Sequence, residues 1–116
     1  MVYAKCPLSM TAPVECYQRA TRTLKGRLIS PYQHEGVAWL LDRETAPKGP
    51  RGGLLCDEMG LGKTIQLISA ILGNPGGRTL VVCPKSVVGQ WASEPEKFAP
   101  GLSVSIHQGV DRTTDY

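Results

Sequence analysis

Aromatic residues are scarce in this 116-residue chain, at 6% of the sequence, so aliphatic side chains must build the core. No apolar run approaches the roughly 20 residues that a membrane-spanning helix requires, and the N-terminus lacks the pattern of a signal peptide. Internal repeats and low-complexity tracts are also missing. Together these absences predict one small globular domain with a modest core, inside a cell.

Paired cysteines are missing as well. The four cysteines are Cys6, Cys16, Cys56 and Cys83, and none stands in a Cys-x-x-Cys pair. A metal site built from Cys6, Cys16 and His34 would match no usual zinc spacing. We therefore expect reduced thiols, with Cys56 and Cys83 each buried at the end of a strand.

Acidic charge is nearly absent from the first 30 residues, although the whole chain has a net charge of only +3. In that stretch Glu15 alone opposes Lys5, Arg19, Arg22, Lys25 and Arg27. We place a basic N-terminal arm at residues 1–26, with a helix over residues 14–24. Such an arm can contact a phosphate backbone. It can equally be a solvated flank, and charge alone does not decide between the two.

What the sequence does contain is a phosphate-binding pattern. Residues 52–56 form a short apolar run typical of a buried strand, and residues 65–72 predict a helix. The residues between them are Asp57, Glu58, Met59, Gly60, Leu61, Gly62, Lys63 and Thr64. Glycines let backbone N–H groups close around an anion, and a helix that begins near Lys63 aims its positive end at phosphates. We predict that this loop binds ATP, with Lys63 at the β- and γ-phosphates and the Thr64 hydroxyl on Mg²⁺.

The loop departs from the general pattern at Asp57, where that pattern has glycine. Residues 57–64 instead resemble the phosphate loop of the Swi/Snf-type ATPases of helicase superfamily two. Two flanking blocks resemble the same group, so the resemblance spans residues 28–109. The upstream block is Leu28, Tyr32, Gln33, Gly36, Val37, Trp39 and Leu40, and the downstream block is residues 80–86 with Gln90, Trp91, Glu94 and Phe98.

Gln33 has two possible roles. Ser30, Pro31 and Gln33 fit the N-cap, the first position and the capping-box position of a helix over residues 31–42. The resemblance implies instead that the Gln33 amide reads the adenine edge, because an amide has the donor and the acceptor that N6 and N7 require. One amide cannot fill both roles well, so they are rival predictions.

The order of elements predicts an α/β fold. A strand, a helix and a second strand over residues 79–83 favour a right-handed βαβ unit, and residues 102–107 alternate like a further strand. The resemblance implies an incomplete RecA-like phosphate-loop domain with a mostly parallel sheet flanked by helices. We assign residues 27–116 to the first part of the N-terminal ATP-binding lobe.

Pro84, Lys85 and Ser86 follow the second strand. The resemblance implies that these residues bind the phosphates of double-stranded DNA, for which backbone N–H groups, a hydroxyl and a cation are suitable donors. The alternative is that Ser86 caps a helix, with Lys85 solvated. Pro95 either limits that helix or starts a second short turn.

The family's Asp-Glu-x-His box, whose acidic residues hold Mg²⁺ and orient the attacking water, does not occur in these 116 residues. The resemblance implies the ATP-binding part of a DNA-dependent ATPase that translocates on duplex or nucleosomal DNA in chromatin remodelling or repair. We expect little hydrolysis without the remainder of the ATPase or a completing partner, a nuclear or else cytoplasmic location, and no membrane partner. A truncated nucleotide-binding remnant and another phosphate-loop NTPase, such as an RNA helicase lobe, are the alternative functions.

Overall fold

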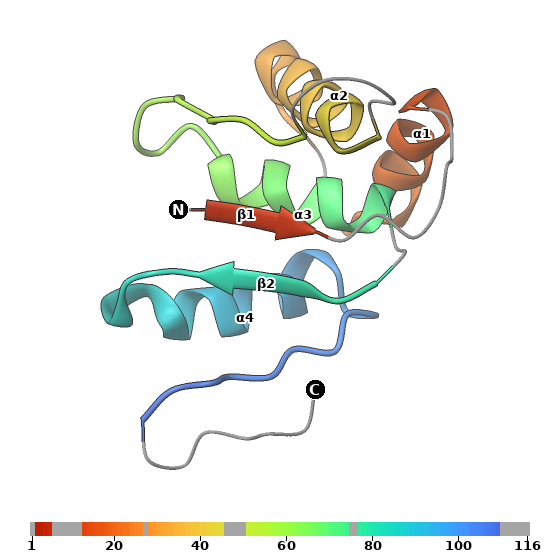
Figure 1. Cartoon of the computed structure of the whole chain (residues 1–116). Coiled ribbons are helices and arrows are strands. Elements are labelled where there is room, and N and C mark those ends of the chain that lie inside the picture. The colour runs from red at the N-terminus through yellow and green to blue at the C-terminus, as the bar shows by residue number, and fades with distance from the viewer. Residues whose placement is uncertain (1, 6–12, 27, 46–50, 75–76, 110–116) are drawn as a thin grey trace.

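The computed structural model describes residues 2–5, 13–26, 28–45, 51–74 and 77–109. In chain order its elements are β1 (Val2–Lys5), α1 (Pro13–Thr23), α2 (Pro31–Thr45), α3 (Lys63–Gly73), β2 (Thr79–Val82), the 3-10 turn η1 (Lys85–Val87) and α4 (Val88–Phe98). In the view of Figure 1, helices α1, α2 and α3 form an upper group, and the strand pair and α4 lie below it. None of the described helices is both long and apolar enough to cross a membrane.

The upper helices enclose the hydrophobic core. Cys16 and Ala20 from α1, Val37 and Leu41 from α2, and Ile68 from α3 have no exposed surface. Aliphatic side chains dominate this cluster, as the low aromatic content predicts. The helix predicted over residues 14–24 is therefore present as α1, and it packs in the same core as the helix that follows the phosphate loop.

Helix α2 begins as its sequence predicts. The side-chain Oε1 of Gln33 accepts a hydrogen bond from the backbone N–H of Ser30 at 3.5 Å, which is the return contact of a capping box. Trp39 lies off the buried stripe of the helix and is partly exposed. Its indole instead covers Gly53, where an added Cβ would overlap the ring. This packing fixes the extended segment that leads into the phosphate loop.

The described strands form an antiparallel pair rather than the mostly parallel sheet that we predict. β1 pairs with β2, with Val2 opposite Val82 and Lys5 opposite Thr79. Residues 52–56 and 102–107 are assigned no strand, because no described segment pairs with their backbone groups. Cys56, expected to be buried at a strand end, is exposed for the same reason.

Helix α4 differs from its prediction at both ends. Ser86 lies in η1 and does not cap the helix; the N-cap residue is Val87, without a side-chain hydrogen bond. The helix also continues through the buried Pro95 to Phe98. Proline removes one helical N–H bond, and the turn that follows it is closed by the N–H of Ala99, which donates to the Pro95 carbonyl at 2.7 Å.

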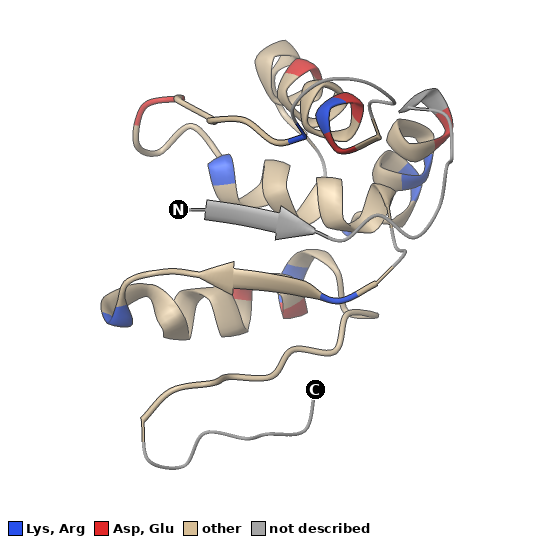
Figure 2. Cartoon of the chain, in the orientation of Figure 1, with Lys and Arg blue, Asp and Glu red and all other residues tan. Residues whose placement is uncertain are grey.

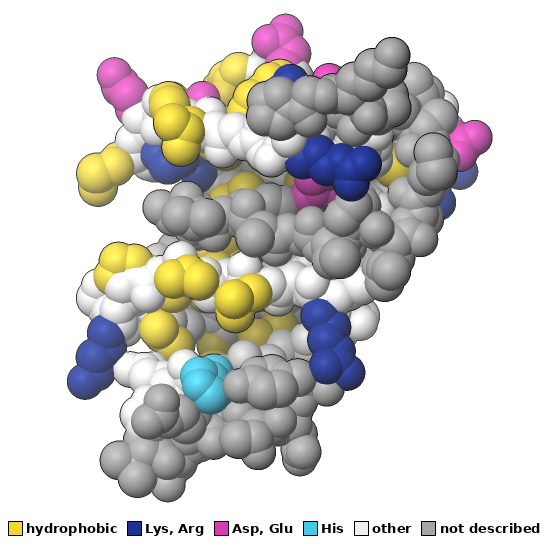
Figure 3. Space-filling model, viewed as in Figure 1, with side chains coloured by type: hydrophobic (Ala, Val, Ile, Leu, Met, Phe, Trp, Pro, Cys, Tyr) yellow, Lys and Arg dark blue, Asp and Glu magenta, His cyan; other side chains and the backbone are white. Residues whose placement is uncertain are grey.

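An uncovered apolar surface runs along the lower part of the molecule. Figure 2 shows no charged residue on β2 or on residues 99–109, and Figure 3 shows hydrophobic side chains gathered over β2. Leu80 is 67% and Val82 58% exposed, while Val104 and Ile106 are about half exposed. A contiguous surface of this kind is typical of a contact site for further protein.

Candidate functional site: the phosphate loop and its supports

The phosphate loop bends sharply before helix α3. Gly60 has φ 83° and Gly62 has φ 84°, a region that L side chains rarely adopt. Gly62 is the N-cap residue of α3, and no side chain caps that end. The first backbone N–H groups of an α-helix have no partner within the helix. The positive end of α3 is therefore left for an anion outside the helix.

Lys63 folds back over the loop from the first position of α3. Its Nζ donates to the carbonyl oxygens of Asp57, at 2.5 Å, and Glu58, at 2.9 Å. Within the described residues this ammonium has only neutral oxygen partners and no carboxylate. A cation held by carbonyls at the start of an uncapped helix can exchange them for the oxygens of an anion.

The other predicted loop residues lie around this ammonium. Thr64 is half-buried, and its hydroxyl has no hydrogen-bond partner among the described residues, so it is available as an oxygen ligand for Mg²⁺. Glu58 and Leu61 are exposed, and Met59 is 94% exposed. The residues predicted to touch phosphate and Mg²⁺ are therefore together, at one end of α3.

Gln33 reaches the same loop. Its Nε2 donates to the Leu61 carbonyl at 3.2 Å, and the Tyr32 hydroxyl donates to the same oxygen at 2.9 Å. The Oε1 of Gln33 accepts from the backbone N–H of Ile29 at 2.8 Å. The side chain is buried, so these backbone partners satisfy its amide. The structure thus joins the start of α2 to the phosphate loop.

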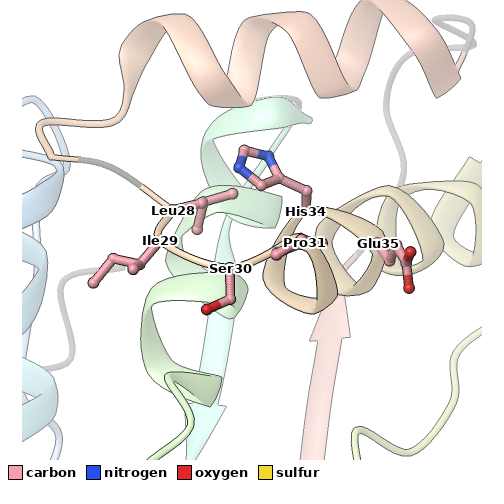
Figure 4. Close-up of a pocket in the computed structure, with 6 residues that line it drawn as sticks. All are labelled: Leu28, Ile29, Ser30, Pro31, His34 and Glu35. Atoms are coloured by element: carbon pink, nitrogen blue, oxygen red, sulfur yellow. The ribbon is translucent and has the colours of Figure 1, made fainter.

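A surface hollow of about 650 Å³ lies beside this junction. It is lined by Leu28, Ile29, Ser30, Pro31, His34 and Glu35, and Figure 4 shows these residues around the start of α2. Within the α1–α2 contact, His34 Nδ1 lies 2.6 Å from the Tyr17 hydroxyl. Two of the lining residues, Ile29 and Ser30, contact Gln33. Their backbone N–H groups donate to its Oε1, so the hollow lies next to the Gln33 amide.

One polar residue of the site escaped the sequence prediction. Gln66 lies on the buried face of α3 and donates from Nε2 to Asp57 Oδ2 at 2.9 Å. The available signal was a single glutamine in the otherwise apolar run of residues 65–68. A polar residue on a buried face needs a hydrogen-bond partner. From that rule, a contact between Gln66 and the phosphate loop could have been predicted.

The three residues predicted to bind DNA lie elsewhere in the fold. Pro84, Lys85 and Ser86 follow β2 and are all exposed. The backbone N–H of Val87 donates to the Pro84 carbonyl at 3.1 Å, which closes the turn. This turn is accessible to a phosphate backbone.

No group of three or more metal-ligating side chains occurs in the described part of the chain, and Cys6 lies outside it.

Comparison with known proteins gives the family. Residues 32–115 match the SNF2-related domain. The ATP-dependent helicase rhp16 of Schizosaccharomyces pombe is 51% identical over 86 residues, which cover 72% of this chain and 10% of that protein. The putative ATP-dependent helicase/translocase YwqA of Bacillus subtilis is 42% identical over 100 residues, covering 81% of this chain and 10% of that protein.

A mammalian protein shows the same similarity. Chromodomain-helicase-DNA-binding protein 1-like of Mus musculus is 43% identical over 91 residues, which cover 74% of this chain and 10% of that protein. The chain thus spans about a tenth of the length of the curated relatives it matches. The family match covers most of the chain and includes Gln33, the phosphate loop and the turn after β2. The chain therefore belongs to the SNF2-related family and represents the N-terminal part of a Swi/Snf-type ATPase.

Proposed function

We propose that this chain forms the ATP-binding part of a Swi/Snf-type DNA-dependent ATPase that couples ATP hydrolysis to translocation on duplex DNA. The observation that carries the proposal is the position of Lys63. Its ammonium closes a glycine loop at the uncapped start of α3 and is held only by the carbonyls of Asp57 and Glu58. This arrangement suits an anion that supplies negatively charged oxygens to the ammonium and to the helix N–H groups.

The residues of the loop divide the work of binding a nucleotide. Lys63 exchanges the two carbonyls for β- and γ-phosphate oxygens, and the backbone of residues 57–62 surrounds the phosphates. The half-buried Thr64 hydroxyl is a ligand for Mg²⁺. When bound, Mg²⁺ neutralises charge on the phosphates.

Gln33 recognises the adenine in this account. Its Nε2 and Oε1 are engaged with the Leu61 carbonyl and the Ile29 N–H, so adenine N6 and N7 must compete with the protein backbone for this amide. Binding of the base therefore loosens a contact to the phosphate loop. Gln33 would cap the backbone when the site is empty and contact adenine when ATP is bound.

Pro84, Lys85 and Ser86 contact DNA phosphates in our proposal. They are exposed at the end of β2, and one relative is named as a DNA-binding protein and another as a chromatin remodelling protein. Such relatives favour duplex or nucleosomal DNA as the track and the nucleus as the location, although a bacterial relative leaves the cytoplasm as the alternative. The exposed apolar residues over β2 suit a contact with the remainder of the ATPase, which would cover them.

A non-catalytic nucleotide-binding remnant is the second candidate. The intact Lys63 and Thr64 at the loop favour a working site instead.

Binding of a fluorescent ATP analogue with Mg²⁺ tests the proposal. We expect the chain to bind it and Lys63→Ala to weaken binding at least tenfold, because a charge-assisted contact to phosphate is lost. Lys97→Ala is the matched control, since Lys97 is an exposed lysine of α4 that pairs only with Glu94 at 3.4 Å. Equal affinity of the wild-type chain and Lys63→Ala would contradict the proposal.

A further inference from the structure

A buried glutamine of α3 contacts the first residue of the phosphate loop. Gln66 has no exposed surface and is followed by four more buried residues, from Leu67 to Ala70. Its Nε2 donates to Asp57 Oδ2 at 2.9 Å, and its Oε1 is buried without a hydrogen-bond partner in the described residues. A buried amide oxygen without a partner is costly, so the side chain is not explained by stability alone.

Gly36 of α2 makes room for this amide. A Cβ added at Gly36 would overlap Gln66 Oε1 and lie 3.1 Å from its Cδ. The glutamine therefore packs directly on the backbone of α2. Its orientation is fixed from two sides, by Gly36 on one and by the Asp57 carboxylate on the other.

Asp57 connects this buried contact to the ammonium of Lys63. The Asp57 side chain accepts from Gln66, while its backbone carbonyl accepts from Lys63 Nζ. Because both groups belong to one residue, holding the carboxylate restricts the movement of the Asp57 backbone and so limits the directions that its carbonyl can take. Asp57 is the position where this loop departs from the general glycine pattern, and a glycine there could not receive the amide.

We propose that Gln66 is a positioning residue, which holds the first peptide of the phosphate loop through the Asp57 carboxylate and so orients the oxygen that receives Lys63. The inference deepens the proposed ATP site and rests on it for its effect on binding. Its effect on the order of the loop does not depend on a nucleotide.

The variant Gln66→Met tests the role. Methionine fills a similar volume, removes the donor and also removes the unpaired buried oxygen. We expect the chain to unfold at an unchanged or higher denaturant concentration. Hydrogen exchange of residues 57–63 without nucleotide should rise by roughly tenfold, and ATP affinity should fall by a similar factor. Exchange in the buried part of α1 should stay unchanged.

The double variant Asp57→Asn with Gln66→Glu supplies a rescue. The amide introduced at position 57 would donate to the carboxylate introduced at position 66, which restores a charge-assisted hydrogen bond in the opposite direction. Because the contact is restored, we expect loop exchange and ATP affinity to lie within about threefold of the wild-type values. Gln90→Met is the matched control, because Gln90 is an exposed glutamine of α4.

The outcomes separate the two proposals. Loop exchange and affinity that do not change in Gln66→Met would overturn the positioning role, as would a rise in exchange that includes α1 and α2 equally. A folded double variant with no rescue would also overturn it. If the wild-type chain fails to bind Mg²⁺-ATP but loop exchange responds as expected, the positioning role stands and the proposed function fails.

Discussion

The side-chain nitrogen of Gln33 donates to the carbonyl of Leu61 over 3.2 Å and so connects helix α2 to the phosphate loop. The contact is so close that an added Cβ on Gly62 would overlap this nitrogen. Gly62 therefore meets two requirements, a left-handed backbone at the start of α3 and space for the Gln33 amide. The side chain expected to read adenine therefore contacts the Leu61–Gly62 peptide of the loop that is expected to bind phosphate.

Gln33→Glu separates the two roles of this side chain. A glutamate keeps the oxygen that accepts from Ile29 and Ser30, but it loses the N–H donor that serves Leu61 and adenine N7. We expect ATP affinity to fall about tenfold, a cost of about 1.4 kcal/mol, because a carboxylate oxygen cannot donate to adenine N7. Unchanged ATP affinity would show that Gln33 is a capping residue only.

Ile68→Ala tests the position of the core. Ile68 has no exposed surface at the meeting of α1, α2 and α3, so removing its side chain leaves a cavity. We expect the free energy of unfolding to fall by about 2–5 kcal/mol, measured by urea titration. The control is Ile29→Ala, since Ile29 is 86% exposed and should change stability by less than about 0.5 kcal/mol. Similar losses for both variants would contradict the described packing.

Lys85→Ala tests the turn after β2 as a DNA contact. Removing one phosphate contact should weaken binding to duplex DNA and lower the slope of log affinity against log salt by about 1, independently of sequence. Lys97→Ala on α4 should leave the slope unchanged. An unaltered slope in Lys85→Ala, measured by fluorescence anisotropy, would remove this turn from the DNA interface.

Turnover tests whether the phosphate site alone is sufficient for hydrolysis. The chain has Lys63 and Thr64 but no Asp-Glu-x-His box, and phosphoryl transfer requires a group that positions the attacking water. We expect phosphate release from Mg²⁺-ATP at a rate no higher than that of Lys63→Ala. A rate of about 1 s⁻¹ or more, within the ordinary range of enzymes, would mean that a water-positioning group is already present.

Local patterns predicted the positions of helices α1, α2 and α3. Ser30, Pro31 and Gln33 mark the start of α2, and the glycines before Lys63 mark the start of α3. These signals act over a few residues, so they hold whatever the rest of the fold does. The sequence was equally informative about the buried face of α2, where Val37 and Leu41 follow helical spacing.

Contacts between distant residues could not be predicted in this way. The pairing of β1 with β2 joins Val2 to Val82, and an apolar run such as residues 52–56 becomes a strand only if a neighbour pairs with it. Pro95 was expected to limit α4 or to start a second short turn, yet the helix continues through this buried residue. Gln66 is explained only when Asp57 and Gly36 are seen around it.

The most direct test of the account is hydrogen exchange of the wild-type chain with and without Mg²⁺-ATP. If the phosphate loop binds the nucleotide, the amides of residues 57–66 and 29–33 should be protected, while those of α4 should not change. The first segment contains the Lys63 contacts and the second contains the Gln33 contacts. Protection that is absent, or confined to residues outside these two segments, would contradict the proposed ATP site.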